Sequence, residues 1–355
     1  MTKTAVVLFN LGGPDSLDAV RPFLFNLFSD PAIIRLPGPL RWLVAKLVSR
    51  KRTPVAREIY KKLGGRSPLL EQTRAQAGLL EQRLDDIGDV SVFVAMRYWH
   101  PFVHEAARDV AQYAPDRIVL LPLYPQFSTT TTGSSLTAWS AAAEKLNLGV
   151  PAATVCCYPI QQSFVQAQVS MVSEALTTLE ETGGDMSDVV VLFSAHGLPK
   201  KIIAGGDPYD WQVEQSAAVV AELLRSTNDA WSALDCRVCY QSRVGPLEWI
   251  GPSTEETIVD AARAGKRIVV VPIAFVSEHS ETLVDLDMEY RQLAEENGAV
   301  AYVRVPALGT HENFVEALAE MVRSAIGREP APGAQSEAGH RACPGDRARC
   351  PMKVV

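Results

Sequence analysis

Short runs of apolar, often β-branched residues alternate along the chain with longer stretches whose apolar positions recur at helical spacing. The apolar runs are nearly continuous, which is typical of parallel strands that are buried on both faces. We expect eight strands, at 5–11, 91–98, 117–124, 152–158, 188–195, 236–242, 267–275 and 300–307. Helical patterns lie between them, at 69–86, 102–113, 162–181, 211–226, 253–264 and 311–326. Strands that alternate with helices predict an α/β fold with parallel sheets.

Two strand sequences occur twice, in the same order in each half of the chain. "VVLFNLGGP" at 6–14 resembles "VVLFSAHGLP" at 190–199, and "RIVLLPLYPQFS" at 117–128 resembles "RIVVVPIAFVS" at 267–277. This repeat predicts two similar α/β halves, 1–175 and 176–328, each a parallel sheet flanked by helices, facing each other across a central cleft. The remainder, 329–355, is rich in Pro, Gly, Ala and charge and is expected to be a linker and a cysteine-containing tail.

Composition narrows the class of protein. The chain has 355 residues and a net charge of −7, with no basic excess that would indicate a nucleic-acid partner. No apolar run reaches the roughly 18–20 residues of a membrane-spanning helix, and the N-terminus lacks the pattern of a secretory signal. We therefore expect a cytoplasmic protein. Its six cysteines then suggest metal or redox chemistry rather than a disulfide framework.

His196 is the first candidate for chemistry. It directly follows the apolar run 190–195, and ligands of open parallel sheets bind at the carboxyl ends of the strands. An ordinary pKa near 6.5 suits a histidine to accept a proton or to bind a metal at neutral pH. A purely structural histidine is the alternative, which the position at a strand end makes less favoured.

A second cluster is the acidic segment "SEHSETLVDLDMEY" at 277–290. If a helix starts near Ser280, then Glu281, Asp285 and Glu289 lie on one face of it. The functional interpretation is a line of oxygen ligands that leads a divalent cation inward. The alternative is a solvated acidic face with Glu281 near the helix N-terminus. One histidine nitrogen with a carboxylate suits Fe(II), Zn(II) or Co(II) better than Mg(II) or Ca(II).

Three further features have both a functional and a structural interpretation. Arg97, in "MRYWHP", can bind a carboxylate or phosphate, or it can form a buried structural ion pair. Trp249 can stack on a flat ligand or belong to the core. The segment 31–53 runs from apolar residues into a basic end, which suits a lip that touches a membrane surface or an amphipathic ligand, or an ordinary packed helix.

Five motifs together resemble the ferrochelatases, which insert Fe(II) into protoporphyrin IX to form protohaem in haem biosynthesis. The motifs are "MRYWHP", "YPQFSTTTTGSS", "LFSAHGLP", "YQSRVGPLEWIGP" and "VPIAFVSEHSETLVDLDMEY", in the order of that family, and the resemblance spans residues 5–328. It implies a chelatase-like fold of two Rossmann-like halves around a porphyrin cleft, and a lyase as the activity.

The resemblance also assigns residues. It makes His196 and Glu281 the catalytic and metal-binding pair, with His279, Asp285 and Glu289 on a metal or proton path. Porphyrin-binding positions fall on Leu11, Arg97, Tyr98, Tyr124 and Trp249. Some relatives carry methionine where this chain has Leu11. Whether His196 accepts pyrrole protons or contacts the iron is left open.

Many ferrochelatases carry a [2Fe–2S] cluster with most of its cysteines in a C-terminal tail. The tail of this chain has Cys343 and Cys350, and such a cluster usually needs four thiolates. Cys156 and Cys157 are the candidates for the other two. Cys236 and Cys239 lie in an apolar strand and are expected to be small buried residues.

The expected partners are protoporphyrin IX and Fe(II), with peripheral contact to the inner membrane through 31–53, in a monomer or homodimer. Two alternatives remain at this stage. One is a related chelatase that loads another metal or acts on coproporphyrin. The other is a non-catalytic haem- or metal-binding protein, which would bind without turnover.

Overall fold

A computed structural model of the chain describes residues 2–242, 247–327, 334–336 and 339–352. Contacts divide the chain into two compact units. The first unit comprises Met1–Cys157, Leu318–Arg341 and Pro351–Lys353. The second comprises Tyr158–Ala317, Ala342–Cys350 and Val354–Val355.

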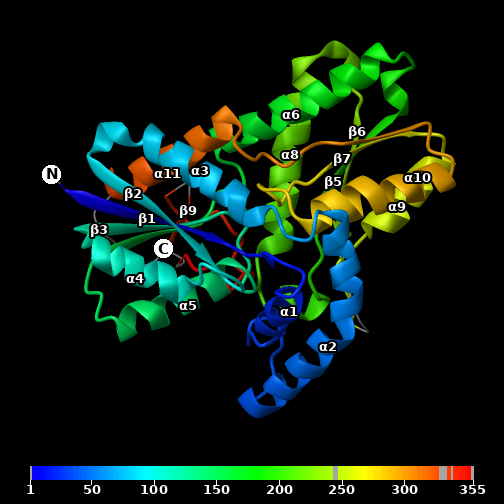
Figure 1. Ribbon diagram of the computed structural model, residues 1–355. Coiled ribbons are helices and arrows are strands. Elements are labelled where there is room, and N and C mark those ends of the chain that lie inside the picture. The colour runs from blue at the N-terminus through cyan, green and yellow to red at the C-terminus, as the bar shows by residue number, and fades with distance from the viewer. Residues whose placement is uncertain (1, 243–246, 328–333, 337–338, 353–355) are drawn as a thin grey trace. The chain divides into compact units, whose positions relative to one another are not determined.

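The first unit contains a five-stranded parallel sheet in the order β2-β1-β3-β4-β9 (Figure 1). Its strands are β1 (Lys3–Asn10), β2 (Asp89–Met96), β3 (Arg117–Pro122), β4 (Ala152–Cys157) and β9 (Ala334–Ser336). Its helices are α1 (Val20–Phe28), α2 (Gly38–Lys62), α3 (Leu69–Arg83), α4 (Val103–Tyr113) and α5 (Thr132–Lys145). The central strand β1 is buried from Ala5 to Phe9, which explains its continuous apolar sequence.

The second unit contains a four-stranded parallel sheet in the order β6-β5-β7-β8. Its strands are β5 (Val189–His196), β6 (Asp235–Gln241), β7 (Arg267–Val271) and β8 (Ala301–Arg304). Its helices are α6 (Gln162–Glu181), α7 (Lys200–Ala204), α8 (Tyr209–Thr227), α9 (Thr254–Arg263), α10 (Tyr290–Glu296) and a π-helix (Glu281–Glu289). Helix α11 (Glu312–Gly327) starts in this unit and continues in the first.

The two sheets have the same strand order. In each, the first strand lies between the second and the third, and the fourth follows the third. The repeated sequences occupy matching places, because 6–14 begins in β1, 190–199 in β5, 117–128 covers β3 and 267–277 covers β7. Two Rossmann-like halves, the fold expected from the sequence, are therefore confirmed.

Helix α4 illustrates how the pattern folds locally. Val103, Ala106, Ala107 and Val110 are all buried, at the spacing that places them on one face of a helix. This face packs on Val7 and Phe9 of β1 and on the neighbouring strands.

One feature differs from the expectation. The tail was not expected to form regular structure, yet Ala334–Ser336 adds strand β9 to the edge of the first sheet beside β4. The contacts change from the first unit to the second between Cys157 and Tyr158. The boundary at 175/176, drawn from the sequence repeat, and the central cleft both stay predictions.

Candidate active site

The strand order determines where a ligand of each sheet can bind. In open α/β sheets the crevice lies outside the carboxyl ends of the strands, where the connections diverge from two neighbouring strands. In the second unit these neighbours are β5 and β7, paired from Val189–Arg267 to Phe193–Val271. His196 is the last residue of β5, and the loop after β7 leads to Glu278, His279 and Glu281. The two motifs predicted to carry the chemistry therefore lie at the same end of the sheet.

His196 and Glu281 form a direct contact. The Nδ1 atom of His196 lies 3.0 Å from Oε2 of Glu281. The two side chains are 38% and 33% exposed, respectively, so the pair is accessible from outside. These residues are 85 positions apart in the sequence, and only the folded sheet brings them together.

The environment stabilises the ionised form of this pair. Burial lowers the pKa of His196, but Glu281 and Asp285 outweigh burial, and the net pKa is raised above its ordinary value. Burial raises the pKa of Glu281, but His196, together with His279, lowers it to about 2. The carboxylate therefore stays charged at neutral pH, and the imidazole binds a proton more tightly than an isolated histidine does.

His279 has a different environment. Its Nδ1 accepts the backbone N–H groups of Glu281 at 3.1 Å and Thr282 at 3.3 Å. These are groups at the start of a helix, which have no partner within the helix itself. Burial lowers the pKa of His279 and so favours the neutral imidazole. Only a neutral imidazole has a ring nitrogen that can accept these two hydrogen bonds.

The acidic segment is a helix that begins at Glu281, next to the start assumed at Ser280. Glu281–Glu289 is a π-helix of nine residues, followed by α10. Within it, burial and then the nearby Glu281 and Glu289 raise the pKa of Asp285 to about 7. Asp285 therefore changes its protonation close to neutral pH.

Trp249 belongs to the same end of the second sheet. The backbone N–H of Lys200 donates to Glu248 at 2.8 Å, and that of Ile250 donates to Leu198 at 3.0 Å. These bonds hold the Trp249 segment against the turn that follows His196. The indole N–H is buried and has no hydrogen-bond partner among the described residues.

Tyr209 is a site residue that the sequence reasoning missed. It begins α8, is only 7% exposed, and its hydroxyl lies close to the backbone of His196. Burial raises its pKa well above the ordinary value, so the phenol is neutral. The sequence feature that could have revealed Tyr209 is Asp207, a residue type that often precedes a helix. In the structure its carboxylate accepts the N–H of Tyr209 at 3.1 Å, at the start of the helix.

The other predicted porphyrin-binding residues lie in the first unit, after the ends of β1, β2 and β3. They are Leu11, Arg97, Tyr98 and Tyr124. Tyr98 is buried, and its hydroxyl donates to Oδ2 of Asp30 at 2.8 Å. Arg97 forms an ion pair with the same oxygen, also at 2.8 Å, while its side chain stays 22% exposed. Arg97 thus makes the buried ion pair that was the alternative to ligand binding, and Asp30 is a partner that the sequence did not suggest.

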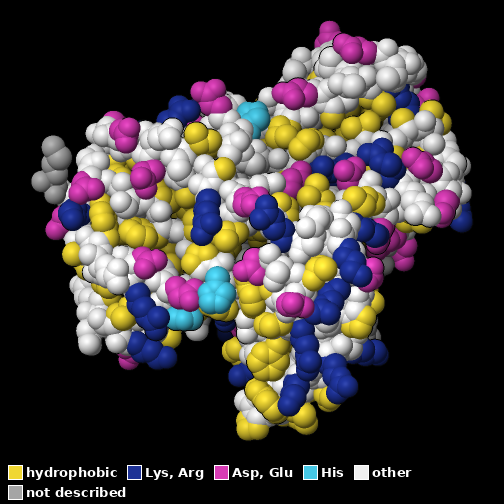
Figure 2. Space-filling model, viewed as in Figure 1, with side chains coloured by type: hydrophobic (Ala, Val, Ile, Leu, Met, Phe, Trp, Pro, Cys, Tyr) yellow, Lys and Arg dark blue, Asp and Glu magenta, His cyan; other side chains and the backbone are white. Residues whose placement is uncertain are grey.

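The segment 31–53 includes the first half of α2. Its exposed apolar side chains are Ile33, Leu40, Trp42, Leu43 and Leu47, with exposed fractions from 37% to 60%. Figure 2 shows hydrophobic side chains at the lower tip of α2 beside a row of Lys and Arg side chains. No helix in the described parts of the chain is long and apolar enough to cross a bilayer.

The six cysteines form three pairs along the chain. Burial raises the pKa of Cys236 to about 11 and that of Cys239 to about 12, so both are protonated and are poor metal ligands. Cys156 and Cys157 end β4 and have their sulfur atoms 3.1 Å apart. Adjacent residues of a strand normally point to opposite faces of the sheet. Here the pairing of β4 with β9 changes register between Val155 and Cys157, at the position of the two cysteines.

The tail cysteines are buried as well. Cys343 and Cys350 are each 8% exposed, and the amide of Gln212 lies 3.1 Å from the Cys343 sulfur. Met352 of the same tail packs against Cys156, Cys157 and Phe127. No group of three metal-binding side chains is preassembled within the described residues.

The chain is thus an α/β protein with two parallel sheets of the same strand order and an accessible histidine–carboxylate pair at the strand ends of one of them. Solved structures with this fold include SirB from Bacillus subtilis with Fe3+, at a TM-score of 0.52 and 12% identity, covering 92% of this chain and 96% of that one. Another is the sirohydrochlorin chelatase SirB from Bacillus subtilis subspecies spizizenii in complex with cobalt, at a TM-score of 0.52 and 11% identity, covering 92% and 95%. At this identity the likeness concerns the fold alone.

The sequence relatives identify the family. The sequence model of the ferrochelatase family matches residues 3–326. The ferrochelatase of Pelagibacter ubique is 50% identical over 90% of both chains, and that of Caulobacter vibrioides is 51% identical over 99% of this chain and 98% of its own. The ferrochelatase of Rickettsia bellii is 44% identical over 98% and 94%. The chain belongs to the ferrochelatase family, and the expected iron-inserting enzyme of haem biosynthesis is confirmed.

Proposed function

We propose that His196 and Glu281 carry the insertion of Fe(II) into protoporphyrin IX. The observation that supports this most is the 3.0 Å contact between the two side chains at the ends of β5 and of the loop after β7. Formation of the product requires the two pyrrole protons to leave as the metal enters. A base at the site is therefore needed as much as a metal ligand.

In this proposal neutral His196 accepts the two pyrrole protons one after the other and passes each on toward Glu281 and Asp285. Glu281 engages Nδ1 of the imidazole, which orients the ring and stabilises the imidazolium that forms when a pyrrole proton arrives. Asp285, Glu289 and His279 form the metal or proton path that continues from Glu281. The porphyrin-contacting set is Leu11, Arg97, Tyr98, Tyr124 and Trp249, to which we add Tyr209.

The histidine variant tests the assignment. His196→Ala is expected to abolish metalloporphyrin formation from Fe(II) and protoporphyrin, with an unchanged circular dichroism spectrum. His104→Ala is the matched control, because His104 is exposed on α4. Turnover near the wild-type rate in the His196 variant would refute the role. Retained iron binding without turnover in the wild-type protein would instead favour the non-catalytic alternative.

Two choices of substrate remain, and the same assay separates them. Protoporphyrin and coproporphyrin differ in the number of their carboxylates, and a site with more cationic side chains would favour the latter. In the first unit the guanidinium of Arg97 is already paired with Asp30. We therefore expect the higher kcat/KM for protoporphyrin. A higher value for coproporphyrin would reverse this choice and leave the chemistry unchanged.

We also propose that Cys156, Cys157, Cys343 and Cys350 hold a [2Fe–2S] cluster, a one-electron redox group when bound. Burial of all four side chains supports this, as does the close approach of the first two sulfurs. Anaerobically purified protein is expected to show charge-transfer absorption and two iron and two sulfide ions per chain. Cys343→Ser should remove both signals and Cys236→Ser should keep them. Iron-free, colourless protein would exclude the cluster.

The exposed start of α2 supports peripheral membrane contact. Leu40, Leu43 and Leu47 recur at helical spacing and are 49%, 47% and 60% exposed. Co-sedimentation with vesicles that contain anionic phospholipid is expected for the wild-type protein and is expected to fall in Leu43→Glu/Leu47→Glu. Val55→Glu is the control, since Val55 is 64% exposed on the same helix outside 31–53. Equal sedimentation of all three proteins would remove this proposal.

A further inference from the structure

The π-helix at Glu281–Glu289 needs a structural cause. π-helices are rare and mostly occur as single-turn bulges, because their hydrogen bonds span five residues and they compete poorly with the α-helix. This one extends over nine residues before the chain returns to α-helix at Tyr290, whose N–H still donates to Asp285. Groups outside the helix must therefore favour it over the α-helical alternative.

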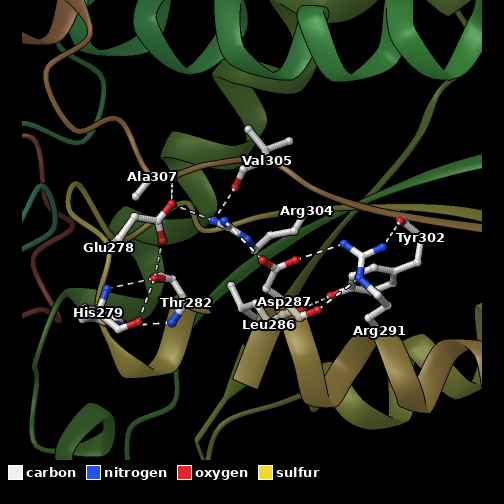
Figure 3. Close-up of polar contacts among 10 residues, drawn as sticks. All are labelled: Glu278, His279, Thr282, Leu286, Asp287, Arg291, Tyr302, Arg304, Val305 and Ala307. Atoms are coloured by element: carbon white, nitrogen blue, oxygen red, sulfur yellow. Dashed lines mark hydrogen bonds and ion pairs between the residues drawn. The ribbon is translucent and has the colours of Figure 1, made fainter. Parts of the chain in front are cut away.

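The outside groups come from strand β8 and from the first turn of α10 (Figure 3). The hydroxyl of Tyr302 donates to the carbonyl of Leu286 at 2.5 Å. The Nε of Arg291 donates to the carbonyl of Asp287 at 3.1 Å, and its Nη1 donates to the carbonyl of Tyr302 at 2.9 Å. Two successive carbonyls of the π-helix are thus bound by side chains.

Arg304, at the end of β8, connects the two ends of the segment. Its side chain is 10% exposed, and Nη1 lies 2.7 Å from Oε1 of Glu278, just before His279. Its Nη2 lies 3.7 Å from Oδ2 of Asp287 within the π-helix. Glu278 in turn accepts the hydroxyl of Thr282 at 2.5 Å, so the loop and the first turn of the helix are tied to the same guanidinium.

The acidic residues of the helix therefore divide into two sets. Residues two apart on a helix do not face each other, so Asp287 points away from Asp285. It therefore also points away from Glu281 and Glu289, which lie four residues before and after Asp285. Asp287 pairs with Arg291 at 3.0 Å as well as with Arg304. Glu281, by contrast, is directed at His196.

We propose that Tyr302 and Arg304 of β8, with Arg291, form a clamp that holds Glu281–Glu289 in the π-helical register. The clamp thereby aligns Glu281, Asp285 and Glu289 for delivery of the metal. Release of the clamp lets the segment relax toward the α-helix of 3.6 residues per turn, which rotates the later carboxylates relative to Glu281. Tyr302, Arg304 and Arg291 are positioning residues, because they act through the helix and contact neither metal nor porphyrin. The inference rests on the proposed role of the acidic line.

The sharpest test is Tyr302→Phe, which removes one hydroxyl and keeps the ring. Loss of one hydrogen bond is expected to raise the KM for Fe(II) about fivefold. The KM for protoporphyrin should stay unchanged and kcat should stay within about twofold. Tyr113→Phe is the matched control, because its hydroxyl donates to Asp89 at 2.7 Å in the first unit. A purely structural role of Tyr302 would lower the melting temperature without this separation of the two KM values, and that result would overturn the proposal.

A second readout does not depend on activity. Hydrogen exchange of peptides that cover 281–296 is expected to be faster in Tyr302→Phe and in Arg304→Gln than in wild type. Arg304→Lys, which keeps the charge, is expected to restore part of the protection. Unchanged exchange in Tyr302→Phe would overturn the clamp even if the protein is an active chelatase. Faster exchange in a protein that proves inactive toward porphyrin would keep the clamp and refute the proposed function instead.

Discussion

At the scale of single residues, the site depends on how each charge is compensated. The His196–Glu281 pair is accessible and coupled, with the carboxylate pKa at about 2 and the imidazole pKa raised. The lowered pKa of Glu281 contributes stability above its ordinary pKa near 4.5, which is lost as the pH falls toward 2. The raised pKa of His196 contributes stability below 6.5, which is lost as the pH rises through the folded-state value. Between these limits both contributions are present.

The first prediction concerns this coupling. Glu281→Gln is expected to lower the pKa of His196, because burial then acts without the carboxylate that outweighs it. The measurement is a pH titration of the imidazole resonances by NMR, which is tractable since the chain has 6 histidines. The resonance of His196 is assigned as the one that is absent from the spectrum of His196→Asn. An unchanged His196 pKa in the glutamine variant would contradict the coupling.

The second prediction concerns the buried carboxylate of the first unit. Asp30 accepts from Tyr98 and Ser134 and pairs with Arg97. Asp30→Asn should lower the free energy of unfolding by about 3 kcal/mol, because it leaves a mostly buried guanidinium without its counter-charge. Asp18→Asn is the control, since Asp18 is 98% exposed beside Arg57, and its effect should stay below about 0.5 kcal/mol. Equal midpoints in urea would contradict this assignment.

At the scale of elements, the ends of helices are where sequence and structure agree most directly. Helix α9 begins with a capping box in which the Ser253 hydroxyl accepts the N–H of Glu256 at 3.0 Å and the Glu256 carboxylate accepts the N–H of Ser253 at 3.3 Å. The π-helix is the opposite case. Its sequence has ordinary helical spacing, and its register depends on side chains from β8, a strand that follows it in the chain.

The third prediction tests the capping box. Ser253→Ala is expected to reduce the free energy of unfolding by about 1 kcal/mol, because the first turn of α9 loses its acceptor. Ser140→Ala, on the exposed face of α5, should change it by less than about 0.5 kcal/mol. Thermal unfolding followed by circular dichroism measures both. A Ser253 variant as stable as the Ser140 variant would contradict the role of the cap.

At the scale of the whole molecule, each half of the chain builds one sheet of the same order, and the tail adds to both units. In the second unit Arg347 pairs with Asp210 at 3.1 Å, and the N–H of Arg349 donates to Gly206 at 2.9 Å. Gly206 has a φ of +91°, and a Cβ there would lie 2.9 Å from the nitrogen of Ala348. The tail therefore packs against the turn that precedes Tyr209.

The fourth prediction tests this packing. Arg347→Ala is expected to speed cleavage of the tail within 339–352 by proteinase K about fivefold, because a partly buried ion pair contributes on the order of 1 kcal/mol. Arg349→Ala is the control, since its side chain is exposed and only its backbone contacts Gly206. Mass spectrometry of the fragments gives the rates. Equal rates for the two variants would show that the ion pair does not hold the tail.

Much of the fold followed from the sequence, because the central parallel strands are buried on both faces and so appear as apolar runs. The eight expected strands match β1 to β8, and the repeated pairs predicted the shared strand order. The tail strand β9 was missed because its three residues carry no apolar pattern of their own and are ordered by the edge of β4. Asp30 was missed because its partners lie 68 and 104 residues away in the sequence.

The sequence by itself determined the two α/β halves, the placement of His196 and the acidic segment at strand ends, and the family. Those features are local, since they depend on which residue types a short stretch presents to a sheet or helix. Only the tertiary structure decided that Nδ1 of His196 meets Glu281, that Asp285 titrates near neutral pH, and that the acidic segment is a π-helix. Each of these depends on burial and on partners from distant parts of the chain, which a one-dimensional pattern does not encode.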